Sequence, residues 1–215
     1  MPKFITFIAL LIGSFYLAPS QAAGFFDGSQ LLTYLEKEIA NTSDYESGVA
    51  AGYLIGIYDT QNGSQFCSSD KKPERVTVRQ LQQTVYDYMK EHSKQWELGA
   101  TLSVMNALKN TEILCSSHKQ AVGFLDGKQF VQYLEKEIAS TSDYESGVAS
   151  GYIIGLYDTH NGTLFCKPGK SGGVSVRQLQ LIVYDYMTAH SDQWDTVASH
   201  VVINALKKTY PFPCD

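Results

Sequence analysis

The sequence predicts an all-α protein in which a small four-helix, disulfide-stapled domain occurs twice in tandem after an N-terminal signal peptide. Three observations lead to this fold class. Apolar residues recur at helical spacing, without the sustained alternation that is typical of strands. Residues 24–67 align without a gap with residues 123–166, and 32 of these 44 positions are identical. The four cysteines occupy matching places in the two halves.

The first 22 residues have the layout of a secretory signal peptide. A positive start at Lys3 precedes an apolar run, and small residues follow it. Cleavage after Ala22 or after Ala23 fits this pattern. The alternative is an uncleaved membrane anchor, but the apolar run is shorter than the roughly 20 residues that a spanning helix needs. We therefore expect a periplasmic or secreted protein that is not inserted in a membrane once the signal peptide is removed.

The rest of the chain divides into two repeats, which we place at residues 23–117 and 118–215. A hydrophobic content of 44% and an aromatic content of 12% argue against disorder. The net charge of −5 and the lack of a basic run argue against nucleic acid as a partner. Both repeats are therefore expected to fold into small domains.

The first two helices of each repeat are set by apolar spacing and by glycines. In the first repeat we expect helices at residues 29–40 and 45–62. The second helix carries glycines four residues apart, and the second repeat has the same stripe. Glycine inside a helix costs about 0.5–1 kcal/mol relative to alanine, so each stripe predicts close packing of another helix. These glycines are Gly48, Gly52, Gly56, Gly147, Gly151 and Gly155.

The third helix has the clearest start signal. Thr77 and Ser175 are each followed three residues later by glutamine, which is the pattern of a capping box. A fourth helix is expected to begin near Ser93 in the first repeat and near Ser191 in the second, with these serines as N-caps.

The cysteines are expected to form one disulfide inside each repeat. The pairs Cys67–Cys115 and Cys166–Cys214 have the same separation (115 − 67 = 214 − 166 = 48). This equality favours local pairing over the alternative in which the disulfides join the two repeats. An exported protein reaches an oxidising compartment, where cysteines form disulfides rather than thiol or metal sites.

No catalytic residue, metal ligand or cofactor is predicted. Two carboxylates can perform acid–base chemistry on a sugar, but solvated helix faces and caps account better for the acids that recur here. The repeated histidines, His92 and His190, are expected to have a structural role at helix ends. The recurring acids are Glu36, Glu38, Asp59 and Asp87 in the first repeat, and Glu135, Glu137, Asp158 and Asp185 in the second.

Each repeat also carries short motifs in a fixed order. G-Y-x-x-G-x-x-D begins at Gly52, a Cys follows, and then come V-R-Q-L, V-x-x-Y-x-x-x-H, N-A-L and a closing Cys. This order resembles that of the Rap/Tai immunity proteins of type VI secretion systems. The resemblance implies a small helical protein of the periplasm that binds a toxic effector and plugs its active-site groove. The best-understood effectors are peptidoglycan amidases, and some members of the family act as homodimers.

The sequence departs from the family pattern in two ways. Many members have a Cys two residues before the Gly-Tyr pair and another in the first helix. Ala50 and Leu35 stand there in the first repeat, and Ala149 and Leu134 in the second, which suits loss of a whole disulfide. The duplication is the second departure. Through it, the fused pair is expected either to mimic a homodimer as an intrachain pseudo-dimer or to bind two effectors.

Candidate partner-binding residues lie at the end of the second helix and in the loop after it. The aspartate that ends this helix either hydrogen-bonds the following loop or faces a partner. The loops differ most between the repeats, which suits selective recognition, although a neutral linker accounts for them equally well. The candidates are Asp59, Asp70, Lys71 and Lys72 in the first repeat, and Asp158, Lys167 and Lys170 in the second.

Together these features predict a non-enzymatic, immunity-type protein of the periplasm. We expect it to bind a cell-wall-degrading effector, a peptidoglycan amidase, and to occlude its active site. The alternative is a periplasmic acid-stress chaperone, which also uses small helical disulfide-linked domains and exposes apolar surface at low pH. A hydrolase is the least favoured class, because no nucleophile and base recur together.

Overall fold

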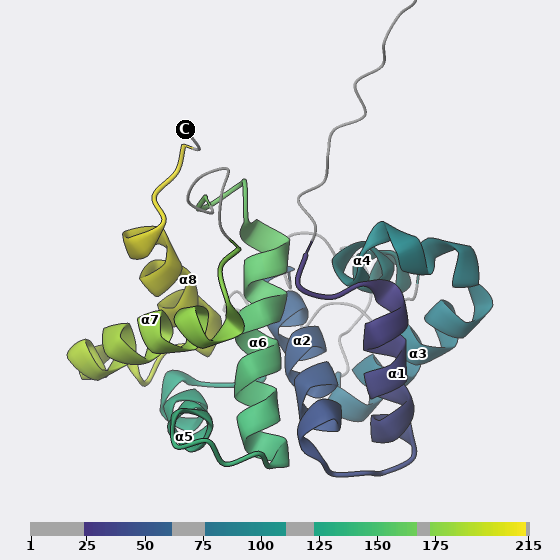
Figure 1. Ribbon diagram of the computed structural model, residues 1–215, viewed down its shortest axis with the longest axis horizontal. Helices are drawn as coiled ribbons and strands as arrows, with labels where there is room; N and C mark the ends of the chain where they lie inside the picture. The colour runs from purple at the N-terminus through teal and green to yellow at the C-terminus, as the bar shows by residue number, and fades with distance from the viewer. Residues whose placement is uncertain (1–23, 62–75, 111–122, 167–172, 214–215) are drawn as a thin grey trace, which may run out of the picture.

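The computed structural model describes residues 24–61, 76–110, 123–166 and 173–213, so the predicted signal peptide lies outside the described residues. The described residues form eight α-helices and no strand, which confirms the predicted all-α class (Figure 1). The first repeat contains α1 (Gly28–Ile39), α2 (Tyr45–Gln61), α3 (Val78–Glu91) and α4 (Ala100–Asn110). The second contains α5 (Gly127–Ile138), α6 (Tyr144–His160), α7 (Val176–Ala189) and α8 (Ala198–Thr209). No helix in the described part of the chain is long and apolar enough to cross a membrane.

The first and third helices begin where their capping residues predict. Asp27 and Asp126 accept a hydrogen bond from the backbone of the third helical residue of α1 and α5. Thr77 and Ser175 form the predicted capping boxes of α3 and α7, in which the side chains of the cap and of the glutamine each bond the other's backbone. These local signals fix the helix starts without tertiary contacts.

The fourth helix begins later than predicted. Ser93 and Ser191 start short 3₁₀-helices, Ser93–Leu98 and Ser191–Gln193, and no side-chain cap is present there. The α-helices α4 and α8 begin only at Ala100 and Ala198. A tryptophan in each connection accounts for the difference, because the Trp96 indole donates a 2.7 Å hydrogen bond to the last turn of α3. This bond turns the chain back before a new helix can start.

The glycine stripes of the two repeats pack against each other. A methyl group on Gly52 would lie 2.0 Å from the carbonyl oxygen of Val148, and one on Gly151 would lie 2.0 Å from that of Val49. The contacts advance in step along both helices, so α2 and α6 run parallel. The predicted close packing of a helix against each stripe is therefore confirmed, and the helix that packs there belongs to the other repeat.

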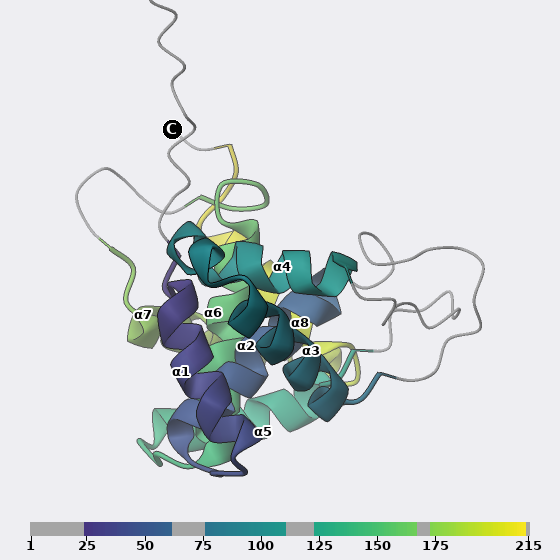
Figure 2. The same cartoon turned by 90° about the vertical axis from the view of Figure 1, so that its right-hand side faces the viewer.

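The remaining helices flank this central pair. In Figure 1, α2 and α6 stand side by side, with α1, α3 and α4 on one side and α5, α7 and α8 on the other. Figure 2 shows α1, α3 and α4 in front of the central pair. The buried apolar residues of both repeats form a single continuous core. The molecule is thus built as a two-fold pseudo-dimer within one chain.

Candidate functional site

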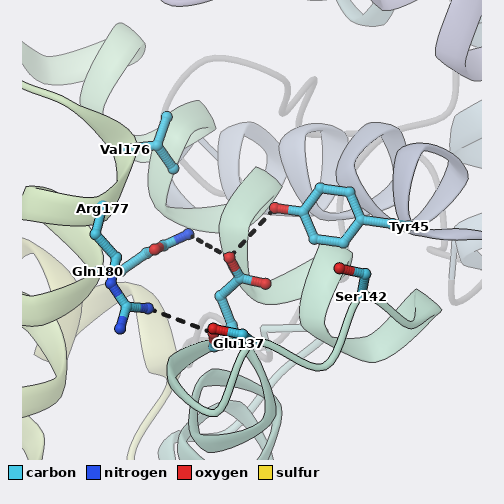
Figure 3. Close-up of a pocket in the computed structure, with 7 residues that line it drawn as sticks. Tyr45, Glu137, Ser142, Val176, Arg177 and Gln180 are labelled. Atoms are coloured by element: carbon cyan, nitrogen blue, oxygen red, sulfur yellow. Dashed lines mark hydrogen bonds between the residues drawn. The ribbon is translucent and has the colours of Figure 1, made fainter.

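A polar pocket lies where the second helix of the first repeat meets the second repeat. It has a volume of about 540 Å³ and is open to solvent. Tyr45 reaches it from α2, whereas every other lining residue belongs to the second repeat (Figure 3). The lining residues are Tyr45, Glu137, Ser140, Ser142, Val176, Arg177 and Gln180. The site therefore exists only while the two repeats are packed together.

The Glu137 carboxylate is the centre of this pocket. Its Oε1 atom accepts a 2.9 Å hydrogen bond from the Gln180 amide and lies 3.3 Å from the Tyr45 hydroxyl. The Ser150 hydroxyl completes the network, at 3.0 Å from Tyr45 and 2.9 Å from Gln180. Burial raises the pKa of Tyr45 above its ordinary value. A phenol is protonated at neutral pH in any case, and the raised pKa keeps it available as a donor to the carboxylate at higher pH as well.

Arg177 supplies positive charge at the rim. Its guanidinium donates to the backbone carbonyl groups of Glu137, at 3.4 Å, and Ile138, at 3.2 Å. These carbonyl groups end α5, and that of Glu137 also accepts a 2.9 Å hydrogen bond from the backbone of Ser140. The arginine adds donors at this end of the helix and complements the negative end of the helix dipole.

The first repeat holds an equivalent network around Glu38. Its Oε1 atom accepts a 3.0 Å hydrogen bond from the Gln82 amide. The same atom lies 3.3 Å from the hydroxyl of Tyr144, which comes from the second repeat. Arg79 donates to the end of α1 in the same way as Arg177 donates to the end of α5. One residue differs, because Ala51 stands where the second repeat has Ser150. The prediction that both glutamates lie on solvated faces is wrong, because they belong to networks that join the repeats.

A second pair of carboxylates joins the repeats at the other end of the central helices. Asp59 accepts 2.9 Å hydrogen bonds from the backbone of Phe124 and from the Tyr152 hydroxyl. Only 5% of Asp59 is exposed, and burial raises its pKa to about 7. The Phe124 and Tyr152 hydrogen bonds act in the opposite direction, because they favour the charged carboxylate.

Asp158, in the second repeat, makes the matching contacts with residues of the first repeat. It accepts hydrogen bonds of 2.9 and 3.0 Å from the backbone of Phe25 and lies 3.2 Å from the Tyr53 hydroxyl. Burial raises the pKa of Asp158 to about 6. The two aspartates thus bond the other repeat, which corrects the expectation that they face the following loop or an outside partner.

The other predicted partner-binding residues lie outside the described residues. These are Asp70, Lys71, Lys72, Lys167 and Lys170. Their role in binding therefore stays a prediction.

Of the four cysteines, only Cys166 lies among the described residues. It is disulfide-bonded, and its backbone N–H donates a 3.1 Å hydrogen bond to the carbonyl of Tyr210, four residues before Cys214. Cys67, Cys115 and Cys214 lie outside the described residues, so pairing within each repeat stays a prediction.

The pocket is suited to binding by hydrogen bonds. Its lining offers one carboxylate, one guanidinium, an amide and three hydroxyl groups, with no histidine or cysteine beside them. Within the described residues, no group of three His, Cys, Asp or Glu side chains could hold a metal ion. His92 and His190 lie elsewhere, at the ends of α3 and α7. Each imidazole ring stacks on a tyrosine ring, with the two ring centroids 4.0 Å apart.

The family of the chain follows from a match that covers both repeats. A single family model, described as Rap1a immunity proteins, matches residues 27–111 and again residues 123–214. The chain belongs to the Rap1a immunity protein family. Each match in this Rap1a protein spans one set of four helices, which confirms the resemblance read from the motifs as two tandem copies. No curated protein matches the chain, and no solved structure does.

The inter-repeat pocket of this Rap1a protein was not predicted. Glu137, Tyr45 and Gln180 each have an equivalent in the other repeat, which is the one signal the sequence carries. Repetition alone does not show that Tyr45 lies beside a carboxylate that is 92 residues away in the chain. That information comes from the register of α2 on α6.

Proposed function

We propose that this Rap1a protein is a periplasmic immunity protein that binds and inhibits a cell-wall-degrading effector of a type VI secretion system. The effector we favour is a peptidoglycan amidase, whose active site the protein would occlude without performing chemistry itself. The observation that carries the proposal is the family match over both repeats, residues 27–111 and 123–214. An immunity protein against such an enzyme has to act where the cell wall is, which agrees with the predicted signal peptide.

The packing of the repeats supports a role in binding. The glycine contacts between α2 and α6 leave no room for side chains between the two backbones. The buried network at Asp59 and the partly buried network at Glu137 fix the two ends of this interface. Because a preorganised surface loses little conformational entropy on association, such a scaffold favours tight binding of a protein partner.

The loops that follow the central helices are our proposed contact regions. Asp70, Lys71, Lys72, Lys167 and Lys170 belong to these loops and offer charged side chains of both signs. The loops differ between the repeats while the helices that carry them are nearly identical. This contrast suits a constant scaffold that presents variable recognition segments. We do not include Asp59 and Asp158, because they bond the other repeat.

Capture followed by an activity assay tests this proposal. The oxidised mature chain is used to isolate partners from the source bacterium and its relatives, and each partner is tested on purified peptidoglycan. We expect one dominant partner that cleaves peptidoglycan and loses this activity when the chain is added in equimolar amount. The mass of the complex then shows whether one or two effectors bind. Failure of every isolated hydrolase to be inhibited would contradict the proposal.

The same experiment separates immunity from an acid-stress chaperone. A chaperone would retain many unrelated proteins, and more of them at low pH. Among the described residues only Leu181 and Phe212 are large, apolar and exposed, which gives little surface for unfolded clients at neutral pH. Burial also raises the pKa of Asp59, so at this carboxyl group acid favours the packed interface and does not open it.

A further inference from the structure

The start of the first repeat lies against a carboxylate of the second repeat. The backbone N–H of Phe25 donates to both oxygens of Asp158, at 2.9 and 3.0 Å. A methyl group added to Gly24 would lie 2.8 Å from Asp158 Oδ2. The backbone of Gly24, and therefore its nitrogen, is within a few ångströms of this carboxylate, because N and Cβ are bonded to the same Cα atom.

This carboxylate has no positively charged partner among the described residues. The ion pairs there involve Lys37, Lys90 and Lys136, none of which reaches Asp158. Its neighbours are hydrogen-bond donors and rings, including the Tyr53 hydroxyl at 3.2 Å. Hydrogen bonds offset part of the cost of removing this carboxylate from water, and a positive charge beside it would offset more.

The matching site in the first repeat does not lie beside a segment that cleavage would turn into a chain terminus. Asp59 faces Gly123 and Phe124 in the way that Asp158 faces Gly24 and Phe25. Gly123, however, lies in the middle of the chain, where its nitrogen is a neutral amide. Only the segment at Gly24 directly follows a predicted cleavage site, so only Asp158 can meet a chain terminus.

We propose that removal of the signal peptide creates an α-ammonium group that forms an ion pair with Asp158 and fixes the mature N-terminus on the second repeat. Hydrolysis breaks one peptide bond with one water molecule. The carboxylate stays on the signal peptide, and the amine of the mature chain takes up a proton. Cleavage after Ala23 puts the ammonium on Gly24 itself, and cleavage after Ala22 puts it one residue earlier. The proposal rests on export and not on the identity of the effector.

The pair would make the mature protein more stable than its precursor. In the precursor the nitrogen of residue 23 or 24 is an uncharged amide, so Asp158 keeps only its hydrogen bonds. In the mature chain the same carboxylate, whose burial is already part of the fold, gains an opposite charge in a site of reduced dielectric, where the attraction between opposite charges is stronger than at the surface. Processing would thereby tighten the contact between the repeats after export.

A double-mutant cycle tests the pair in the complete mature protein. Mass spectrometry of the exported protein first gives its true N-terminus. Chains are then compared that begin at this residue or three residues upstream, each with wild-type Asp158 or with Asp158→Asn. We expect the upstream extension to lower Tm by about 2–4 °C in the wild-type background, and to have no further effect in Asp158→Asn. Asp59→Asn is the matched control, in which the extension should keep its full effect.

A second measurement does not depend on stability. The pKa of the N-terminal amine, followed by NMR on chains labelled at that residue, should lie above its ordinary range of about 7.7–8.0. It should return to that range in Asp158→Asn and stay raised in Asp59→Asn. Additive effects in the cycle, an ordinary amine pKa in the wild-type chain, or a mature N-terminus other than residue 23 or 24 would each overturn the proposal.

Discussion

The Tyr152 hydroxyl donates a 2.9 Å hydrogen bond to the Asp59 carboxylate, across the boundary between the two repeats. Tyr53 and Asp158 form the equivalent contact at 3.2 Å with the roles of the repeats exchanged. A contact that occurs twice with its partners exchanged is characteristic of a two-fold homodimer. In this protein a single polypeptide contains both halves.

The stability of the protein should depend on pH through Asp59. Burial raises the pKa of this carboxyl group from 3.8 to about 7. Between about pH 4 and pH 7 the folded chain keeps protons that the unfolded chain releases, so this contribution to stability falls as pH rises. Asp59→Asn should flatten the fall by up to about 1.4 kcal/mol per pH unit, measured by urea unfolding across this range.

The comparison between variants removes the effect of other carboxyl groups. Hydrogen bonds lower the pKa of Asp27, Asp44 and Asp143, and their contribution to stability is lost only as pH falls below their unfolded value. Asp185→Asn, on the exposed face of α7, is the matched control for the removal of one carboxyl group at the surface. An unchanged slope in Asp59→Asn would contradict the assigned role of this carboxyl.

Alanine at a central glycine should separate the repeats. The new methyl group of Gly151→Ala would lie 2.0 Å from the carbonyl oxygen of Val49, a backbone atom that cannot move without shifting α2. We expect a loss of about 1–3 kcal/mol, although the helix itself favours alanine over glycine. Gly173→Ala is the control, because no atom lies within 4 Å of its added methyl group. Chemical unfolding measures both, and equal stability of the two variants would argue against the glycine interface.

The pocket network should couple residues of different repeats. A double-mutant cycle with Tyr45→Phe and Glu137→Gln is expected to give a coupling free energy of about 0.5–1.5 kcal/mol. Tyr45→Phe combined with Glu38→Gln is the mismatched control, because Glu38 bonds Tyr144 instead. Those two changes should be additive. Coupling in the control pair and none in the matched pair would show that the side chains are not arranged as described here.

The disulfides should lie within the repeats. Proteolysis without reduction is expected to release the linked peptides Cys67–Cys115 and Cys166–Cys214. Replacing both cysteines of the second pair by alanine should cost about 2–5 kcal/mol, since the unfolded chain loses a cross-link. A peptide that links Cys67 to either cysteine of the second repeat would refute this pairing.

Features set by neighbouring residues could be predicted from the sequence. The capping boxes at Thr77 and Ser175 need only residues three positions apart, and both form as predicted. The glycine stripes predicted a close helix contact, because three glycines in a helix interior are unfavourable without one. The sequence did not show which helix fills the stripe, since either repeat contains suitable candidates.

Features set by tertiary contacts could not be predicted. Ser93 looks like a helix cap, but the hydrogen bond from Trp96 to the end of α3 delays the fourth helix until Ala100. Glu137 looks like a solvated residue in its own helix, and only the packing of α6 on α2 brings Tyr45 to it. The candidate site consists of such contacts, so it becomes visible only in the folded chain.

Survival of cells that export the effector tests the immunity function most directly. A peptidoglycan amidase effector is directed to the periplasm of cells that produce either the full chain or the same chain without residues 1–22. We predict that the full chain prevents lysis and that the chain retained in the cytoplasm does not. Lysis at the same rate with the full chain, for every amidase effector of the source bacterium and its relatives, would contradict the proposed function.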